Sequence, residues 1–562
     1  MNQKNLSNLV LPITIIIISV LIAIPIGSLL YGSFWSSRPG APGQFTLENY
    51  LEVLSNTRSI GLLVNSLAFA IGSAILATSI GTILAFITTR TDTPLRRVFT
   101  FIPFLPLIVP GVVDNLAWIF LLRPKTGLVN IFLMDTLGLP GPLFNIYTLW
   151  GMIWVMGLGL IPLAFVGARS ALVSIDPALE DAARISGKGI KQIILKITFP
   201  LILPAILSIF LLTFIISFEA FETPAMIGIP GNIDVYMGVI YYQIASKIPP
   251  DYGIATAQAT VMLAVTMISV YLYRKSQKRA EKFAVITGKG YSPRIMKIGK
   301  WRYVTLAILF TYLIINIILP FFTLLMVSLN AYWNPRDLFG SITFKHYLDL
   351  PAYTQIFTSF INSIIVSFAS ATIAILAATI IAYYSLRTRI KRKGLLEAVS
   401  MLPISFPGLV LGMGLLWAFI KLPIYGTIWI LIIAFVIKYI PHGVRFVSQP
   451  ILQIHKDLED ASRVSGGSLL YTIRRIVLSL LKPALIGGWV YIAMISFREL
   501  GTIVLLVSPN SQLISSQLFT MWYTGHLEEA VAASLVLVAS LWVLIIIWGL
   551  ITKIKFKFSP TP

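Results

Sequence analysis

Two short segments of the sequence carry charged side chains where they could bind a charged solute. Residues 217–224 contain Glu219 and Glu222, and residues 496–502 contain Arg498 and Glu499. Carboxylates suit hard cations, whereas an arginine suits an anion or a carboxylate on a partner. Each segment follows a long apolar run, and charges at the end of such a run that face a cavity are functional candidates. The alternative interpretation is that these charges mark helix ends or form an internal salt bridge.

Apart from carboxylates, the chain has few side chains that could bind a metal. The sequence has no cysteine, which excludes disulfides, thiolate metal sites and iron–sulfur clusters, and it has only four histidines. A histidine-rich metal cage is therefore not expected. We expect the chain itself to bind no metal and no cofactor.

A second pair of segments has the pattern of a docking helix. In residues 176–187, Asp176 is a natural N-cap and Pro177 suits the first helical position. Gly187 can reverse the chain, because glycine readily takes positive φ. Residues 455–466 repeat this pattern, so each loop is expected to form a short helix ended by a turn. The candidate residues are Leu179, Glu180, Asp181, Ala182, Ala183 and Gly187 in the first loop and Leu458, Glu459, Asp460, Ala461, Ser462 and Gly466 in the second.

The spacing within each loop predicts a surface for a partner protein. Leu179 and Ala183 lie one helical turn apart, while Glu180 and Arg184 share another face. A ridge of small residues beside a leucine can enter a narrow groove on a partner. Buried apolar anchors would then supply affinity, and the charged pair would set the register.

The elements that position these segments are membrane-spanning helices. The chain is 57% hydrophobic and 12% charged with a mean hydropathy of +0.86, whereas a soluble domain has about 25% charged residues. An all-α polytopic membrane protein is therefore expected. Apolar ranges long enough to cross about 30 Å of hydrocarbon predict twelve spans, near residues 10–32, 60–88, 98–121, 146–168, 199–218, 253–273, 303–327, 359–385, 396–420, 425–444, 480–497 and 529–550.

The basic residues predict the orientation of these spans. The net charge of +21 resides mainly in short loops between apolar runs, which is how topology signals are placed, so binding to nucleic acid is not expected. Lysine and arginine concentrate on the side that holds both termini, which predicts that both lie in the cytoplasm. Residues 274–302 carry ten basic residues and one acid, and are expected to form a cytoplasmic linker lying against anionic lipid headgroups.

This linker separates two similar halves, residues 1–273 and 303–562. Asn65-Ser66 and Pro110-Gly111 reappear at an offset of 297 as Asn362-Ser363 and Pro407-Gly408, and the two docking loops match at an offset of 279. The difference is an 18-residue surplus within the outside loop 122–146 of the first half. Each half holds an even number of predicted spans, so the halves are expected to be parallel repeats with a solute path at their interface.

The docking loops resemble the EAA loop of ABC importer permeases. The matching stretches are Asp181-Ala182-Ala183-x3-Gly187 and Asp460-Ala461-Ser462-x3-Gly466, with Asp in place of the first Glu in both and Ser462 in place of the second Ala. In that family the loop is a coupling helix that docks on a nucleotide-binding subunit. No G-x-x-x-x-G-K-[ST] motif occurs in this chain. The resemblance therefore implies a permease that is not itself an enzyme, with two separate ATP-binding cassette subunits that hold ATP and Mg.

The fused halves and the segments around Glu219 and Arg498 are most similar to ferric-iron permeases of the type I importer fold. That resemblance implies a multi-pass inner-membrane subunit that receives ferric iron from a solute-binding protein on the outer side. Relatives that carry thiamine, polyamines, phosphonates or sulfate share the layout. The alternative of another class is an ion-gradient-driven secondary transporter. It would have a Gly-x-x-x-Asp-Arg-type loop after the second span, which residues 91–97 do not match.

Overall fold

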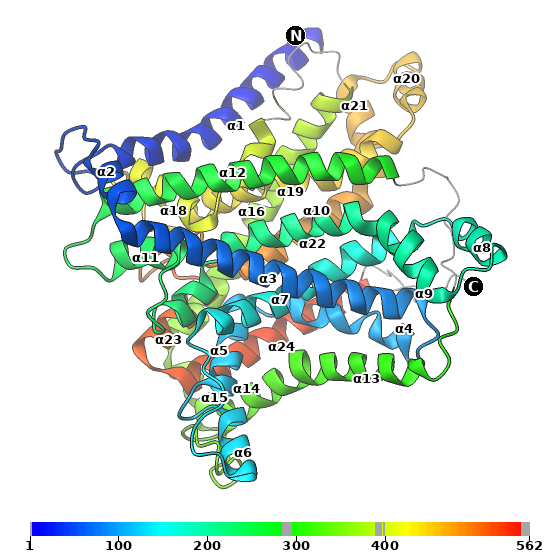
Figure 1. Cartoon of the computed structure of the whole chain (residues 1–562). Coiled ribbons are helices and arrows are strands. Elements are labelled where there is room, and N and C mark those ends of the chain that lie inside the picture. Colours follow the sequence, from blue (N-terminus) through cyan, green and yellow to red (C-terminus); the bar gives the residue numbers. More distant parts are fainter. Residues whose placement is uncertain (1–2, 284–294, 388–395, 397–398, 552–562) are drawn as a thin grey trace. The chain divides into compact units, whose positions relative to one another are not determined.

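The computed structural model describes residues 3–283, 295–387, 396 and 399–551 (Figure 1). Within these ranges the chain forms helices joined by loops, and the extended contacts are three isolated β-bridges. The predicted all-α class is confirmed. The central part of the predicted basic linker, residues 284–294, lies outside the described residues.

Contacts divide the chain into two compact units. Unit 1 comprises residues 1–56, 240–263 and 353–517, and unit 2 comprises residues 57–239, 264–352 and 518–562. Three of the five boundaries fall within helices, namely α11 (Tyr236–Ala245), α12 (Tyr252–Phe283) and α23 (Ile514–Thr524). The other helices of unit 1 are α1 (Gln3–Ser33), α2 (Glu48–Ser55), α16 (Thr354–Arg387), η6 (Leu402–Ser405), α18 (Gly408–Phe419), α19 (Ile428–Gln453), α20 (Lys456–Val464), α21 (Leu469–Thr472), η7 (Ile473–Val477) and α22 (Leu478–Phe497).

Unit 2 contains the remaining helices. They are α3 (Thr57–Arg90), α4 (Arg96–Phe99), η1 (Ile102–Ile108), α5 (Gly111–Leu122), α6 (Leu128–Leu137), α7 (Leu149–Val173), α8 (Pro177–Ile185), α9 (Ile190–Ile193), η2 (Ile194–Thr198), α10 (Phe199–Phe218), η3 (Pro224–Gly228), α13 (Trp301–Leu313), η4 (Ile314–Ile318), α14 (Leu319–Leu329), α15 (Lys345–Asp349), η5 (Leu350–Ala352) and α24 (Leu527–Ile551).

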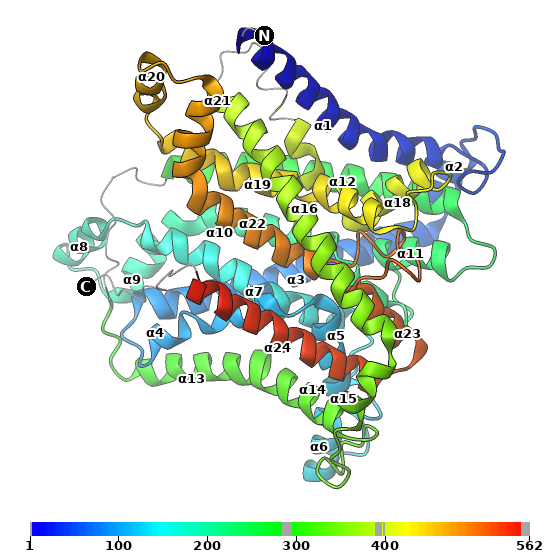
Figure 2. The same cartoon turned by 180° about the vertical axis from the view of Figure 1, so that it is seen from behind.

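Each unit combines central helices of one sequence half with terminal helices of the other. In unit 2, α3 packs along α7 and α10, and α14 from the second half packs against α5 and α24 (Figures 1 and 2). In unit 1, α16 packs along α19 and α22, and α1 from the first half packs against α18. The predicted boundaries at residues 273 and 303 follow the sequence repeat and stay a prediction. The packing units do not follow these boundaries, because each unit contains segments of both sequence halves.

Nine helices of the described residues are long and apolar enough to cross a membrane, and eleven if each of two bent pairs counts as one span. The twelve predicted ranges include these eleven, and α24 coincides with the twelfth. The bent pairs replace the predicted spans 98–121 and 396–420, with bends of 101° and 113° before α5 and α18. Val109 and Phe406, the residues before Pro110 and Pro407, are extended at these bends, because a proline disfavours helical geometry in the residue before it.

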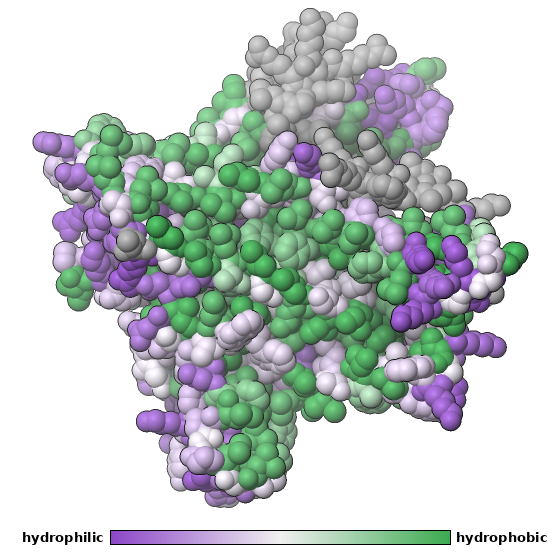
Figure 3. All heavy atoms as spheres, in the orientation of Figure 1, coloured by the Kyte–Doolittle hydropathy of each residue, from purple (hydrophilic) through white to green (hydrophobic). Residues whose placement is uncertain are grey.

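The outer faces of the long helices are apolar. On α3, large apolar side chains such as Val64, Ile75 and Ile83 are exposed, and Figure 3 shows hydrophobic residues over the region of α3 and hydrophilic residues gathered near α8. Exposed aliphatic side chains along a helix of this length fit a hydrocarbon environment. The structure therefore supports a multi-pass membrane protein.

Repeated polar residues make matching contacts within the two units. In unit 2 the Asn65 side chain donates to the Asp234 carbonyl, and Ser66 Oγ accepts from the Tyr236 amide. In unit 1 Asn362 donates to the Gln512 carbonyl, and Ser363 Oγ accepts from the Ile514 amide. The Asn-Ser pair of each half thus ties its second span to the chain that follows its fifth span.

Candidate functional site

The first docking loop has the predicted local structure. Asp176 caps α8, with its Oδ1 accepting a 2.9 Å hydrogen bond from the Ala178 amide, and Pro177 occupies the first turn. Gly187 has φ of +78°, a conformation that glycine adopts without steric cost. The side-chain cap, the proline and the left-handed glycine together set both ends of this nine-residue helix.

The second loop reaches the same shape with a different cap. Helix α20 is also nine residues long, and Gly466 has φ of +81°. His455 stands at the N-cap position without a side-chain cap bond, and its ring lies 3.0 Å from the Asp457 carboxylate. The repeated glycine geometry is therefore the feature that the two loops share most closely.

Each docking helix presents two apolar side chains outward. Leu179 and Ile185 of α8 are 46% and 89% exposed, and Leu458 and Val464 of α20 are 46% and 90% exposed. Leu179 and Leu458 were predicted, whereas Ile185 and Val464 were not. The signal for them was available, since an apolar residue recurs at this repeat position beside an otherwise polar helix.

The predicted docking face needs a correction. Glu180, Ala183 and Glu459 are buried, so these side chains point into the protein rather than toward a partner. Glu180 therefore cannot set the register against another subunit, as the spacing had suggested. The outward face of α8 is formed by Leu179, Ala182 and Ile185, and Asp181 is half-buried. On α20, Asp460 and Ala461 are exposed and Ser462 is half-buried.

Each buried glutamate binds an arginine at the end of a long span. In unit 2, Arg90 Nη1 lies 3.2 Å from Glu180 Oε2, and Thr198 Oγ1 donates to Glu180 Oε1 at 2.9 Å. In unit 1, Arg387 Nε lies 3.2 Å from Glu459 Oε1. Arg90 and Arg387 are the last residues of α3 and α16. A buried charge is stable only when it is paired, so these contacts fix the side on which each docking helix packs.

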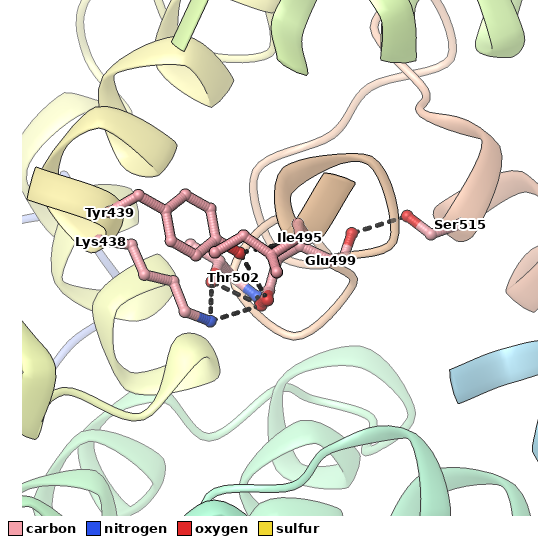
Figure 4. Close-up of polar contacts among 6 residues, drawn as sticks. All are labelled: Lys438, Tyr439, Ile495, Glu499, Thr502 and Ser515. Atoms are coloured by element: carbon pink, nitrogen blue, oxygen red, sulfur yellow. Dashed lines mark hydrogen bonds and ion pairs between the residues drawn. The ribbon is translucent and has the colours of Figure 1, made fainter. Parts of the chain in front are cut away.

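The predicted solute-path residue Glu499 lies in a polar cluster within unit 1. Lys438 Nζ lies 2.6 Å from Glu499 Oε1, and the Tyr439 hydroxyl donates to Glu499 Oε2 at 3.0 Å (Figure 4). Both the amide and the hydroxyl of Thr502 donate to Glu499 Oε1, and the Ser515 hydroxyl donates to the Glu499 carbonyl. The internal salt bridge considered as the alternative therefore exists at Glu499. A role for Arg498 or Glu499 in the solute path stays a prediction.

The bend before α18 packs against this cluster. A β-carbon at Gly408 would lie 2.9 Å from both Glu499 Oε1 and Lys438 Nζ, so the absence of a side chain at this position lets the cluster approach the first turn of α18. A carboxylate near a helix N-terminus is favoured by the helix dipole.

The corresponding bend in unit 2 has a different set of charges beside it. A β-carbon at Gly111 would lie 3.4 Å from the Glu222 carboxyl carbon, and one at Gly159 would lie 3.4 Å from Asp114 Oδ2. Glu219 directly follows α10 and is half-buried. Among the described residues no group of three or more histidine, aspartate or glutamate side chains could hold a metal ion.

Asp114 and Lys438 were absent from the predicted site. Each lies within a predicted span, and a charged residue inside a span is expensive and usually faces the protein interior. That rule was a sufficient signal for both residues. The internal repeat gives no signal for Lys438, because the corresponding residue of the first half is Gly159.

Removal of the Glu499 carboxylate is expected to destabilise the protein. The variant Glu499→Ala should lower the free energy of unfolding by about 3 kcal/mol, because Lys438 would keep its charge in a mostly buried position without a counter-charge. Thermal unfolding of the purified protein measures the change. The matched control is Lys247→Ala, which breaks the exposed ion pair with Asp251 and should cost at most about 1 kcal/mol. Equal losses in the two variants would contradict the prediction.

The chain is similar in sequence to known transport permeases. The sequence model of the family described as "Binding-protein-dependent transport system inner membrane component" matches residues 77–282 and 373–554. The chain is 26% identical to the ferric transport system permease protein FbpB of Actinobacillus pleuropneumoniae, over 95% of this chain and 76% of that protein.

Two further relatives extend this comparison. A putative ferric transport system permease protein FbpB 1 of Haemophilus influenzae is 26% identical over 89% of this chain and 78% of that protein. A putative 2-aminoethylphosphonate transport system permease protein PhnV of Salmonella paratyphi A is 26% identical over 40% of this chain and 85% of that protein. The two family matches fall one in each sequence half and together cover more than half of the residues. The chain therefore belongs to the family of binding-protein-dependent inner-membrane transport components, and it is a non-catalytic permease subunit of an ABC importer.

Proposed function

We propose that this permease imports ferric iron and that α8 and α20 couple it to two separate ATPase subunits. The observation that carries the coupling role is the repetition of one exposed shape. Each docking helix presents a leucine and a β-branched residue outward at closely similar exposures, and each is followed by a glycine with positive φ. Two equivalent anchors on one chain suit two copies of one partner, because each copy would meet the same surface.

The basic loops support placing both docking helices and both chain termini in the cytoplasm. Lys188, Lys191 and Lys196 follow α8, and Arg474 and Arg475 follow α20. Cytoplasmic loops carry an excess of lysine and arginine, and ATP is available on that side. A solute-binding protein would then deliver its cargo to the opposite face. In this mechanism ATP binding draws the two ATPase subunits together, and the docking helices pass that movement to the spans.

The choice of ferric iron rests on the relatives. Two relatives named as ferric transport permeases match 89% and 95% of the chain. The carboxylates Asp114, Glu219 and Glu222 agree with a hard cation as cargo. The match to a putative 2-aminoethylphosphonate permease over 40% of the chain makes a phosphonate the second candidate.

Reconstitution would test the proposed cargo. Liposomes holding the permease, its ATPase subunits and a binding protein loaded with radioactive ferric iron should accumulate iron only when ATP is present. An uncoupler should have no effect, because no ion gradient drives the step. A matched vesicle set with 2-aminoethylphosphonate should show no uptake above background. Uptake of the phosphonate without iron would overturn the assignment of cargo, and uptake that needs an ion gradient instead of ATP would overturn the coupling role.

A further inference from the structure

A buried arginine–glutamate ion pair holds each docking helix against the end of a long span. We propose that Arg90–Glu180 and Arg387–Glu459 are mechanical latches that make each docking helix move as one body with its adjoining spans. This inference rests on the proposed coupling role of α8 and α20. The glutamates and arginines act as positioning residues, since neither touches the solute or ATP.

The first argument is that the pair recurs in both units although its two members are far apart in sequence. Arg90 and Glu180 are separated by 90 residues, and Arg387 and Glu459 by 72 residues. The arginines match at an offset of 297 and the glutamates at an offset of 279. The insertion in the first half changes the spacing between the partners, yet each unit brings them within 3.2 Å. Packing has therefore assembled the same contact twice.

The second argument is burial. The side chains of Arg90 and Glu180 are 0% and 2% exposed, and those of Arg387 and Glu459 are 7% and 8% exposed. Breaking such a pair by moving one partner away leaves a buried charge without compensation, which is strongly unfavourable. A docking helix held in this way resists sliding or rotating against the end of its span. A surface ion pair would give little resistance, because water and ions replace its contacts.

The third argument is that each helix has a second polar link to the start of the fifth span of its half. In unit 2 that link is Thr198, which donates to Glu180 from the last residue of η2. In unit 1 the residue matching Thr198 is Val477, which cannot donate. There Ser462 Oγ lies 2.8 Å from Thr472 Oγ1 instead. Ser462 is the residue that departs from the alanine of the EAA pattern, and the departure restores the missing link.

Further bonds strengthen the second latch. The Tyr383 hydroxyl donates to Glu459 Oε2 at 3.0 Å, and Arg387 Nη2 donates to the carbonyls of Ile451 and Ile454. Those carbonyls lie where α19 gives way to α20. Arg387 therefore ties α20 to the end of α19 as well as to α16.

A double replacement in each half would test the latches without leaving a lone buried charge. The variant combines Arg90→Met and Glu180→Leu with Arg387→Met and Glu459→Leu, since a buried ion pair is often replaceable by apolar residues of similar size. In liposomes with the ATPase subunits and iron-loaded binding protein, we expect normal assembly and ATP hydrolysis within twofold of the unmodified complex. Iron taken up per ATP hydrolysed should fall at least tenfold. The matched control, Arg336→Gln, breaks the exposed pair with Asp135 and should change neither quantity.

The outcomes separate this inference from the proposed function. If the variant with all four substitutions took up as much iron per ATP hydrolysed as the unmodified complex, the latch proposal would be overturned, whereas the coupling role would stand. A failure of the unmodified complex to show ATP-driven uptake would overturn the proposed function itself.

A second measurement needs no transport. Because the chain has no cysteine, spin labels can be attached solely at Ile83→Cys on α3 and Lys188→Cys directly after α8, which are both exposed. The Lys188 amide donates to the Ala183 carbonyl, so this label follows the end of α8 while the docking face stays unlabelled. We expect the distance between these labels in the complex to stay the same with and without bound ATP. A shift or broadening of that distance on ATP binding would overturn the latch, whatever the cargo. The conservative variant Glu180→Gln, which keeps the acceptor for Thr198 but loses the charge, should broaden the distribution.

Discussion

Replacement of both Gly187 and Gly466 with valine is expected to lower ATP-driven uptake at least tenfold. Both glycines have φ near +80°, a conformation that costs other residues about 1–2 kcal/mol each and is worse for a β-branched side chain. The new β-carbon would meet no other atom within 4 Å at either position. The expected loss therefore arises from the backbone, which would leave the left-handed conformation and redirect the end of each docking helix.

The control for this prediction uses the same positions. Asparagine adopts the left-handed conformation more readily than other non-glycine residues, so Gly187→Asn with Gly466→Asn should retain most of the uptake. The measurement is ATP-dependent uptake and ATP hydrolysis in the reconstituted complex, together with copurification of the ATPase subunits. Full uptake by the valine variant would show that the chain reversal is not needed and would exclude these loops as the coupling elements.

Replacement of Ile185 and Val464 with aspartate is expected to weaken binding of the ATPase subunits about a hundredfold or more. Burial of an aliphatic side chain of this size contributes about 1.5–3 kcal/mol, and each factor of ten in affinity corresponds to about 1.4 kcal/mol. Each ATPase subunit loses one anchor, which accounts for about 1.5–3 kcal/mol, and the cost of burying a carboxylate adds to that loss. Both side chains are about nine-tenths exposed in the isolated chain, so folding of the permease should not change.

The test is the amount of ATPase that copurifies with the permease, and thermal unfolding confirms that the permease is folded. Ile185→Val is the matched control, because the second docking helix has valine at this position and the change removes a single methylene. The control should bind the ATPase normally. Retention of the ATPase by the aspartate variant would place the docking surface elsewhere on the chain.

The sequence determined the features that depend on neighbouring residues or on composition. The apolar runs predicted the helical membrane class, because a chain in hydrocarbon must satisfy its backbone within helices. Asp176, Pro177 and Gly187 predicted the start and end of α8, since capping and left-handed turns are local properties. The matched loops, with two internal offsets, predicted the repeat and led to the family before any packing was known.

The tertiary structure alone decided which side of each docking helix is buried. The spacing of Leu179 and Ala183 is compatible with either side of α8 facing a partner, and the outcome depends on Arg90, which lies 90 residues away. It also decided the bends before α5 and α18, because a proline in an apolar run can kink a span or break it. The helices exchanged between the sequence halves and the Lys438–Glu499 pair also depend on packing between distant segments. Burial and charge pairing across such distances are properties of the folded chain, and a local pattern does not encode them.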